Sequence, residues 1–307
     1  MVFSLLTGSS RPISIIIKDH VIRFVELKST TPLVIQRSGE RTLPNGLIKE
    51  GKIIDRETLV MILEEVIQDW GIKNRRIQFI VPDSYVVIRK VEVPLDVMDD
   101  EIRGYLYYEL GTSIHLPFEN SVIDYALIGK NEEKKSVILF ASPEEVVTEY
   151  TELFQEVKLK PVVADISPLS LYRLYFLNDQ SRSDERLLFV QFDVTSVNLS
   201  ILEDYKPIFM RHLVMEESEV ESNDLTSPLQ DYYREIERVM SFYQFSLNKG
   251  NQRITKVVVT GDHPMLQQIV KDISSLVDLP VEPLPIHDSS ELSNGFQLVV
   301  GLALKEV

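Results

Sequence analysis

The chain has 307 residues, of which 44% are hydrophobic, enough to bury a substantial core in about two domains. Its 47 acidic residues against 32 lysines and arginines give a formal net charge of −15, which disfavours nucleic acid and anionic membrane surfaces as partners. The absence of cysteine excludes disulfides and thiol chemistry and fits a reducing compartment. No segment resembles a secretory signal or approaches the roughly 18 apolar residues of a membrane span. We therefore expect an intracellular protein that reaches a membrane only through a partner.

The first part of the chain predicts a β-meander, a helix and two further strands. Strand-forming residues dominate until Pro44 and Gly46 interrupt the pattern. Apolar residues then recur at helical spacing, so one face of this helix is expected to pack on a sheet. The predicted elements are strands over 13–27 and 33–43, a helix capped by Asp55 and ended by Gly71, and strands over 77–81 and 85–93.

A smaller α+β unit is predicted next. Asp99 or Asp100 is expected to cap a helix whose apolar residues form one stripe, because acidic side chains accept hydrogen bonds from free amides at helix starts. Two strands, over 121–128 and 135–141, follow this helix. A helix and two strands are enough for a compact insertion.

The remaining chain repeats the order of the first part. Ser142, Pro143 and Glu145 are typical of a capping box with proline in the first turn of a helix. Three successive strands and a long helix then follow, so we predict two similar α/β lobes. The predicted elements are a strand over 161–166, a helix over 169–177, strands over 186–193, 197–203 and 207–213, a helix over 227–247, strands over 256–260 and 281–284, and a helix over 295–305.

No motif of a known catalytic or metal centre is present. The five histidines lack the spacing of metal ligands, and there is neither a nucleophile elbow nor a P-loop. Residues 7–10 are compatible with a phosphate-binding turn or with a free chain end. Glu235 and Arg238, on the predicted long helix, are compatible with an interlobe cleft or with solvent. We therefore expect a protein that is not an enzyme.

Several short stretches match the motifs of one known family. The run LPNGLIKEGKI occupies 43–53, LPFE occupies 116–119 and precedes a DY pair at 124–125, and VGLAL occupies 300–304. These stretches resemble the LPxGxIxxGxI, LPF and GLAL segments of the type IV pilus assembly protein PilM family, whose members are actin-like and related to FtsA. The resemblance extends over nearly the whole chain. Further family segments resemble residues 142–147, 163–166 and 235–243.

This resemblance implies an α/β fold of the actin-like kind, with two duplicated lobes and an inserted small α+β domain of the SHS2 type. The insertion would replace an actin subdomain. The domains that we expect are a first lobe over 13–92 plus 142–183, the insertion over 93–141, and a second lobe over 184–307.

The resemblance also implies a function. In the family, a cleft between the first lobe and the insertion receives the short cytoplasmic N-terminal tail of the inner-membrane protein PilN and couples it to other pilus machinery. We expect a cytoplasmic scaffold with this role in type IV pilus, competence or secretion pseudopilus assembly, recruited to the inner face of the membrane by its partner. Leu116 and Phe118 are also compatible with the core of the insertion. The predicted groove residues combine aromatic and apolar area: Val87, Tyr105, Tyr108, Leu116, Phe118 and Tyr125.

The phosphate-binding segments of the family are altered in this chain. The family's GLDIGSS corresponds to SIIIKDH at 14–20, its VDIGxxxT to VQFDVT at 190–195, and its SGGG to TGDH at 260–263. Acidic side chains at these loops would repel a triphosphate, and lost glycines prevent close approach of the backbone. The degenerate nucleotide-site positions are Ile16, Lys18, Asp19, Gln191, Asp193, Thr195, Gly261 and Asp262.

We therefore expect no cofactor, because the acids that position magnesium in such sites are missing. The alternative is an actin-like ATP-binding switch or ATPase of the same machinery, with residues 7–10 serving as a displaced phosphate loop. A third interpretation is a filament-forming element similar to FtsA.

Overall fold

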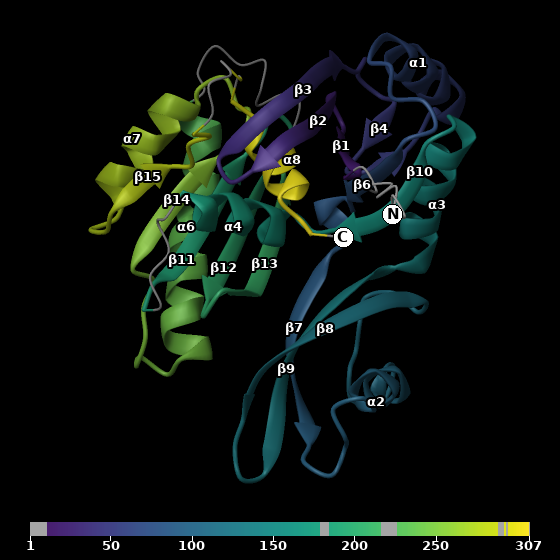
Figure 1. Ribbon diagram of the computed structural model, residues 1–307. Coiled ribbons are helices and arrows are strands. Elements are labelled where there is room, and N and C mark those ends of the chain that lie inside the picture. Colours follow the sequence, from purple (N-terminus) through teal and green to yellow (C-terminus); the bar gives the residue numbers. More distant parts are fainter. Residues whose placement is uncertain (1–10, 179–183, 216–225, 288–291, 293, 307) are drawn as a thin grey trace, which may run out of the picture.

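The computed structural model describes residues 11–178, 184–215, 226–287, 292 and 294–306. Two five-stranded sheets have equivalent strand orders, β3-β2-β1-β6-β10 and β13-β12-β11-β14-β15 (Figure 1). In each sheet the first three strands are antiparallel neighbours and the last two are added in parallel. This repetition is the duplicated α/β architecture that the order of elements predicts.

The first lobe encloses its core between its sheet and two outer helices. The side chain of Asp55 accepts a 3.0 Å hydrogen bond from the Thr58 amide and caps α1, as the sequence predicts. Leu63 of α1 and Phe154 of α3 are fully buried against the sheet. The elements are β1 (Ile13–Lys18), β2 (Val21–Thr30), β3 (Leu33–Thr42), β4 (Ile48–Lys49), β5 (Lys52–Ile53), α1 (Arg56–Asp69), β6 (Arg76–Ile80), η1 (Asp83–Tyr85), α3 (Glu144–Glu156), β10 (Lys160–Asp165) and α4 (Ser167–Leu177).

The insertion is a three-stranded sheet of order β7-β9-β8 with α2 on one face. It extends beyond the first lobe (Figure 1), and β7 also contacts β13 of the second lobe. Its core places Ile102 and Leu106 of α2 against Val137 and Leu139 of β9. Since β7 pairs with β9 from Val87 onward, the small sheet begins before the boundary at residue 93 that the sequence suggests. Its elements are β7 (Val87–Pro94), α2 (Ile102–Glu109), β8 (Ser121–Lys130) and β9 (Lys134–Pro143).

The second lobe repeats the plan, with α6 and α7 covering the outer face of its sheet. Ile236 of α6 and Ile269 of α7 are fully buried against Val190 and Val259 of the strands. The predicted long helix changes to a π-helical turn, η2 (Phe242–Leu247), at its C-terminal end. The other elements are β11 (Arg186–Phe192), β12 (Ser196–Glu203), β13 (Lys206–Val214), α6 (Thr226–Ser241), β14 (Lys256–Thr260), α7 (Leu266–Leu276), β15 (Val281–Pro283) and α8 (Gln297–Ala303).

Where the two lobes meet, each sheet is covered by a helix that comes from the other half of the chain. Helix α8, from the end of the chain, packs on β1 and β2 of the first lobe, while Tyr175 of α4 lies edge-on against Phe189 of β11 in the second lobe. Helices α4 and α8 also pack on each other. The first lobe expected from the sequence, 13–92 plus 142–183, therefore includes α4, although α4 covers the sheet of the second lobe. Among the described residues, none of the helices has the length and apolar character that a membrane crossing requires.

Two predicted helix caps do not form. The N-cap of α2 is Glu101, and the Asp99 carboxylate instead accepts a 2.6 Å hydrogen bond from Lys135 Nζ of β9. Ser142 remains in β9, opposite Val122, so its hydroxyl is not directed at the amides of α3. In both places a tertiary contact or a continuing strand overrides the local capping pattern.

We expect Gly301→Ala to lower the free energy of unfolding by about 1–3 kcal/mol, because overpacking a tight contact forces backbone shifts. A Cβ at this position in α8 would lie 2.0 Å from the Ser170 carbonyl oxygen of α4. Urea unfolding followed by circular dichroism measures the loss.

Gly104→Ala is the matched control, because Gly104 is also helical and a Cβ there meets no atom within 4 Å. It should raise the stability by about 0.5–1 kcal/mol. Equal effects of the two substitutions would contradict the tight α4–α8 contact.

Candidate functional site

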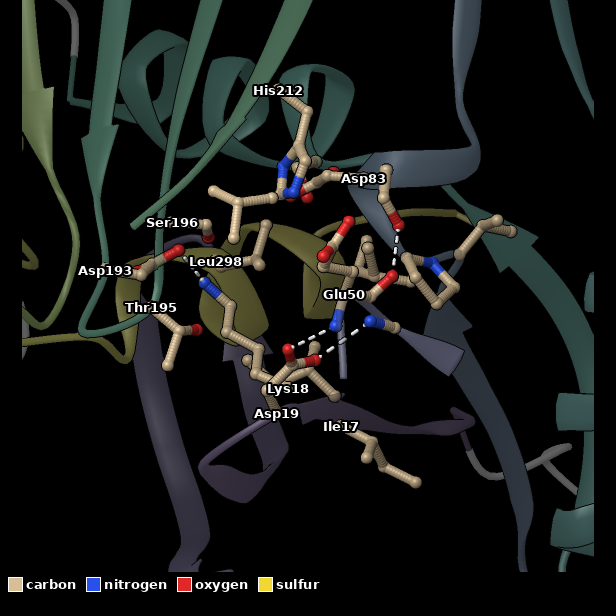
Figure 2. A pocket seen from close by; sticks show the side chains of 18 residues that line it. Ile17, Lys18, Asp19, Glu50, Asp83, Asp193, Thr195, Ser196, His212 and Leu298 are labelled. Carbon is tan, nitrogen blue, oxygen red and sulfur yellow. Dashed lines mark hydrogen bonds and ion pairs between the residues drawn. The ribbon is translucent and has the colours of Figure 1, made fainter. Parts of the chain in front are cut away.

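The predicted nucleotide-site positions converge on the cleft between the two lobes (Figure 2). Five of them, Ile16, Lys18, Asp19, Asp193 and Thr195, line a cavity of about 60 Å³. Such a volume holds a few water molecules and is far below the roughly 300 Å³ of a small-molecule pocket. The site is therefore filled by the protein's own side chains.

An ion pair crosses the cleft between Lys18 Nζ at the end of β1 and Asp193 Oδ2 after β11 (Figure 2). Gln191 Nε2 donates a 2.6 Å hydrogen bond to the same carboxylate oxygen. The side chain of Asp193 is only 2% exposed, so its charge depends on these partners. The resemblance equates these two loops with the family's phosphate loops, and here an ammonium and a carboxylate fill the space between them.

Asp262 makes a second set of contacts across the cleft. Its Oδ2 accepts 2.7 Å hydrogen bonds from His20 Nε2 and Arg23 Nη1, and its Oδ1 accepts a 3.1 Å bond from the Val194 amide. Burial alone would raise the pKa of Asp262. The hydrogen bond from His20 and the positive charges of Lys18 and Arg23 outweigh burial and hold this pKa well below its usual range.

Gly261 is the glycine that remains of the family's adenosine segment. Its φ of +122° is in the region that favours glycine, and a Cβ would lie 1.8 Å from the Phe192 carbonyl oxygen. Packing between the ends of β11 and β14 therefore requires this glycine whether or not a nucleotide binds.

A polar chain that the sequence analysis missed also joins the lobes. Asn198 Nδ2 donates a 2.9 Å hydrogen bond to Asp83 Oδ2, and Asn198 Oδ1 lies 2.7 Å from His212 Nδ1. This orientation of the amide places the hydrogen of His212 on Nδ1. Burial raises the pKa of Asp83, and the charge of Lys18 offsets only part of this effect. Asn198 and His212 are opposite each other in β12 and β13. Asn198 is a polar residue between Val197 and Leu199, and this was the available signal in the sequence.

A larger and open cleft of about 980 Å³ lies between the first lobe and the insertion. Tyr85, Phe118 and Val146 give it an apolar surface. Burial raises the pKa of Tyr85, and so does the negative charge of nearby glutamates. Lys52 is the only basic residue among the described residues that line this cleft. Its acidic lining residues are Glu119, Glu144, Glu145, Glu149 and Glu152.

The structure does not gather all six predicted groove residues at this cleft. Phe118 lines it, and together with Leu116 it also lines an adjoining hollow on the insertion. Val87, Tyr105 and Tyr125 are half-buried against the core of the insertion, while Tyr108 is 78% exposed on α2.

The glutamates of α3 were missed, although their pattern is in the sequence. Glu145, Glu149 and Glu152 recur at helical spacing, beside the buried stripe that contains Tyr150 and Phe154.

Two further sequence candidates lie elsewhere. Glu235 is buried and bonded to Arg211 at 2.8 Å and to Arg238 at 3.1 Å, so it lines neither cleft. Residues 7–10 fall outside the described part of the chain. Within that part, no group of histidine and acidic side chains has an arrangement that could hold a metal ion.

We expect Asp262→Asn to destabilise the protein by about 3 kcal/mol at neutral pH, because it removes one member of a buried charge cluster. The folded pKa of Asp262 is lowered, so its stabilising contribution is present above its unfolded pKa of about 4 and is lost as the pH falls further. Urea unfolding at several pH values should thus show the difference between wild type and variant shrinking below about pH 4.

The control is Asp231→Asn, which breaks an ion pair with Arg234 whose members are both well exposed. Its effect should stay below about 1 kcal/mol. A wild-type advantage over Asp262→Asn that does not change with pH would contradict the assignment.

Comparisons with known proteins identify the family of this chain. The model of the family described as type IV pilus assembly protein PilM matches residues 14–233. A solved PilM-PilN type IV pilus biogenesis complex is similar with a TM-score of 0.80 and 18% identity, over 97% of this chain and 98% of that chain. No curated protein matches the sequence.

Two more distant structures share the architecture. The ethanolamine utilization protein EutJ from Carboxydothermus hydrogenoformans has a TM-score of 0.54 and 12% identity, over 95% of this chain and 89% of that one. A Bacteroides thetaiotaomicron protein with an actin-like ATPase fold and unknown function has a TM-score of 0.50 and 14% identity, over 98% and 99%. These likenesses confirm the predicted actin-like fold. Since the family model covers more than half of the sequence, the chain belongs to the type IV pilus assembly protein PilM family.

Proposed function

We propose that this chain is a cytoplasmic scaffold for type IV pilus assembly or a related competence or secretion system. It would bind the N-terminal cytoplasmic tail of a PilN-like inner-membrane protein, which recruits it to the membrane, and it would do so without nucleotide turnover. The acidic cleft between the first lobe and the insertion is the observation that carries this proposal. The similar structure of a PilM-PilN complex supports the choice of partner.

The chemistry of the cleft specifies the kind of tail that fits. Tyr85, Phe118 and Val146 offer apolar contact area, which suits a peptide with aromatic or aliphatic anchors. The five surrounding glutamates favour a peptide with arginine or lysine beside those anchors, and they would speed its encounter with the cleft.

The interlobe cleft supports the proposed lack of nucleotide turnover. Its cavity of about 60 Å³ is far smaller than a nucleotide requires, and the Lys18–Asp193 ion pair fills the space between the two loops. The space of this site does not fit magnesium–ATP. A role as an ATP-dependent switch would need a rearranged cleft.

We expect Glu145→Lys with Glu149→Lys to weaken tail binding by at least tenfold, because two attractive charges at the cleft become repulsive. Isothermal titration calorimetry with a synthetic tail of the PilN-like protein from the same organism measures the affinity. The same peptide with its basic residues replaced by glutamate should bind neither protein.

The matched control is Glu57→Lys with Glu64→Lys, which makes the same change in net charge on the exposed face of α1. This variant should bind the tail within about twofold of wild type at physiological salt, because distant exposed charges are screened. Equal weakening in both double variants would show that the cleft does not bind the peptide.

We expect magnesium–ATP at millimolar concentration to give neither binding heat nor a rise in Tm, because the cavity between the lobes is too small for a nucleotide and a ligand raises Tm only if it binds the folded state. Thermal shift and calorimetry on the purified chain measure both quantities. Binding with micromolar affinity would instead favour an actin-like ATP-binding switch in the same machinery.

A further inference from the structure

Three sets of side-chain contacts join the lobes at the cleft where actin-like proteins hold a nucleotide. Lys18 forms an ion pair with Asp193, and Asp83 accepts a hydrogen bond from Asn198. His20 and Arg23 both bond to Asp262. Each of these contacts joins a residue of the first lobe to one of the second. We propose that these contacts form a clamp that keeps the lobes closed without any ligand, and that the clamp also holds the turn that lines the peptide cleft.

The clamp resists opening because its two buried carboxylates take their positive partners from the opposite lobe, although Arg23 also pairs with Glu40 of its own lobe. Asp193 and Asp262 are 2% and 5% exposed, and each carboxylate is compensated mainly from the opposite lobe or from its own loop. Partial separation of the lobes would break these ion pairs and leave carboxylates that are neither paired nor fully hydrated, which is costly. A bound nucleotide closes lobes of this kind by bridging them, and here fixed side chains make the bridge.

Close packing around Arg23 adds a steric component. A Cβ at Gly295, which has a φ of +99°, would lie 2.8 Å from Asp262 Cβ and 2.9 Å from the Arg23 guanidinium carbon. The guanidinium also lies 5.6 Å from the ring centre of Phe296. Arg23, a first-lobe residue, is thus enclosed by the segment that leads into α8.

Three unpartnered polar atoms border the small cavity. Among the described residues, Asp83 Oδ1, Asp193 Oδ1 and His212 Nε2 are buried without hydrogen-bond partners, and their residues line the cavity of about 60 Å³ (Figure 2). A few water molecules in this space would satisfy them. Closure therefore requires no larger ligand.

The turn η1 connects the clamp with the peptide cleft. Asp83 lies in the clamp, and Tyr85, two residues later in the same turn, lines the cleft that contains Phe118 and Val146. Residues two apart in a 3₁₀ turn are directed to different sides of it. Opening the lobes would pull on Asp83 and move Tyr85, so the lobe arrangement sets the shape of the peptide cleft.

The distance between the lobes tests the clamp in the chain alone. Because the chain has no cysteine, Met61→Cys on α1 and Lys271→Cys on α7 provide exactly two positions for spin labels. Without nucleotide, the otherwise wild-type protein should give one narrow distance distribution. Lys18→Asp, which places a carboxylate against Asp193, should broaden and lengthen it, and the charge swap K18D/D193K should restore it.

Two further variants keep the test decisive. Lys18→Met removes the ion pair without adding repulsion, and it replaces Lys18→Asp if that variant fails to fold. Asp231→Asn breaks an exposed ion pair within α6 and should leave the distribution unchanged. A broad distribution in the wild type, or an unchanged one in a folded Lys18 variant, would overturn the clamp.

The link to the peptide cleft rests on the proposed function and has its own measurement. Lys18→Asp should weaken binding of the synthetic tail about fivefold, and the charge swap should recover it. An opened variant with undiminished affinity would overturn the link but not the clamp. A wild type that binds no tail would overturn the proposed function, while the distance measurement would still decide on the clamp.

Discussion

The contact between α4 and α8 is the constraint on which both clefts depend. Each helix covers the inner face of the sheet that belongs to the other half of the chain. Asp165, at the end of β10, reinforces this exchange because its buried carboxylate pairs with Arg173 of α4 at 2.7 Å and with Lys305 after α8 at 3.4 Å. With the two helices fixed in this way, the ends of β1 and β11 are held face to face and their side chains must accommodate each other.

This forced proximity explains why the two altered phosphate loops fit together. A lysine alone at position 18 would place an uncompensated ammonium at a nearly closed cleft, and an aspartate alone at position 193 would bury an unpaired carboxylate. Present together, they neutralise each other. Lys18 and Asp193 are therefore best understood together, as one pair of compensating charges. Gly261 remains because strand packing, and not phosphate, requires it.

The fold could be predicted from the sequence to the extent that it depends on local periodicity. The apolar spacing of α1 and the buried run of β14 identify their elements directly, and the repeated order of elements predicts the two lobes. Helix caps were less predictable. Asp99 accepts a hydrogen bond from Lys135 of β9, and the sequence around Asp99 gives no sign of this contact. The exchange of α4 and α8 between lobes is likewise invisible in any local pattern.

The cleft between the first lobe and the insertion was only partly predictable for a related reason. Aromatic composition identifies residues that prefer burial or contact, but it cannot separate those that fill the core of the insertion, such as Tyr105, from those that face a cleft, such as Phe118. The cleft takes its walls from α3, η1 and the insertion, which are distant in the sequence. Its acidic character was nevertheless visible in the spacing of glutamates along α3.

The loop that matches the family's LPxGxIxxGxI pattern connects the two clefts physically. Asp19, next to Lys18, accepts hydrogen bonds from the amides of Glu50 at 2.6 Å and Gly51 at 2.9 Å. The Gly51 carbonyl in turn accepts a 2.8 Å bond from the Tyr150 hydroxyl of α3, the helix that carries the cleft glutamates.

Gly51 is also required for steric reasons, because its φ is +77° and a Cβ would lie 2.4 Å from Pro82, directly before η1. The motif thus has a structural role that does not involve phosphate: it ties the end of β1 to two elements, α3 and η1, that line the cleft between the first lobe and the insertion. The agreement of this loop with the family pattern can therefore be explained by its packing and hydrogen bonds alone.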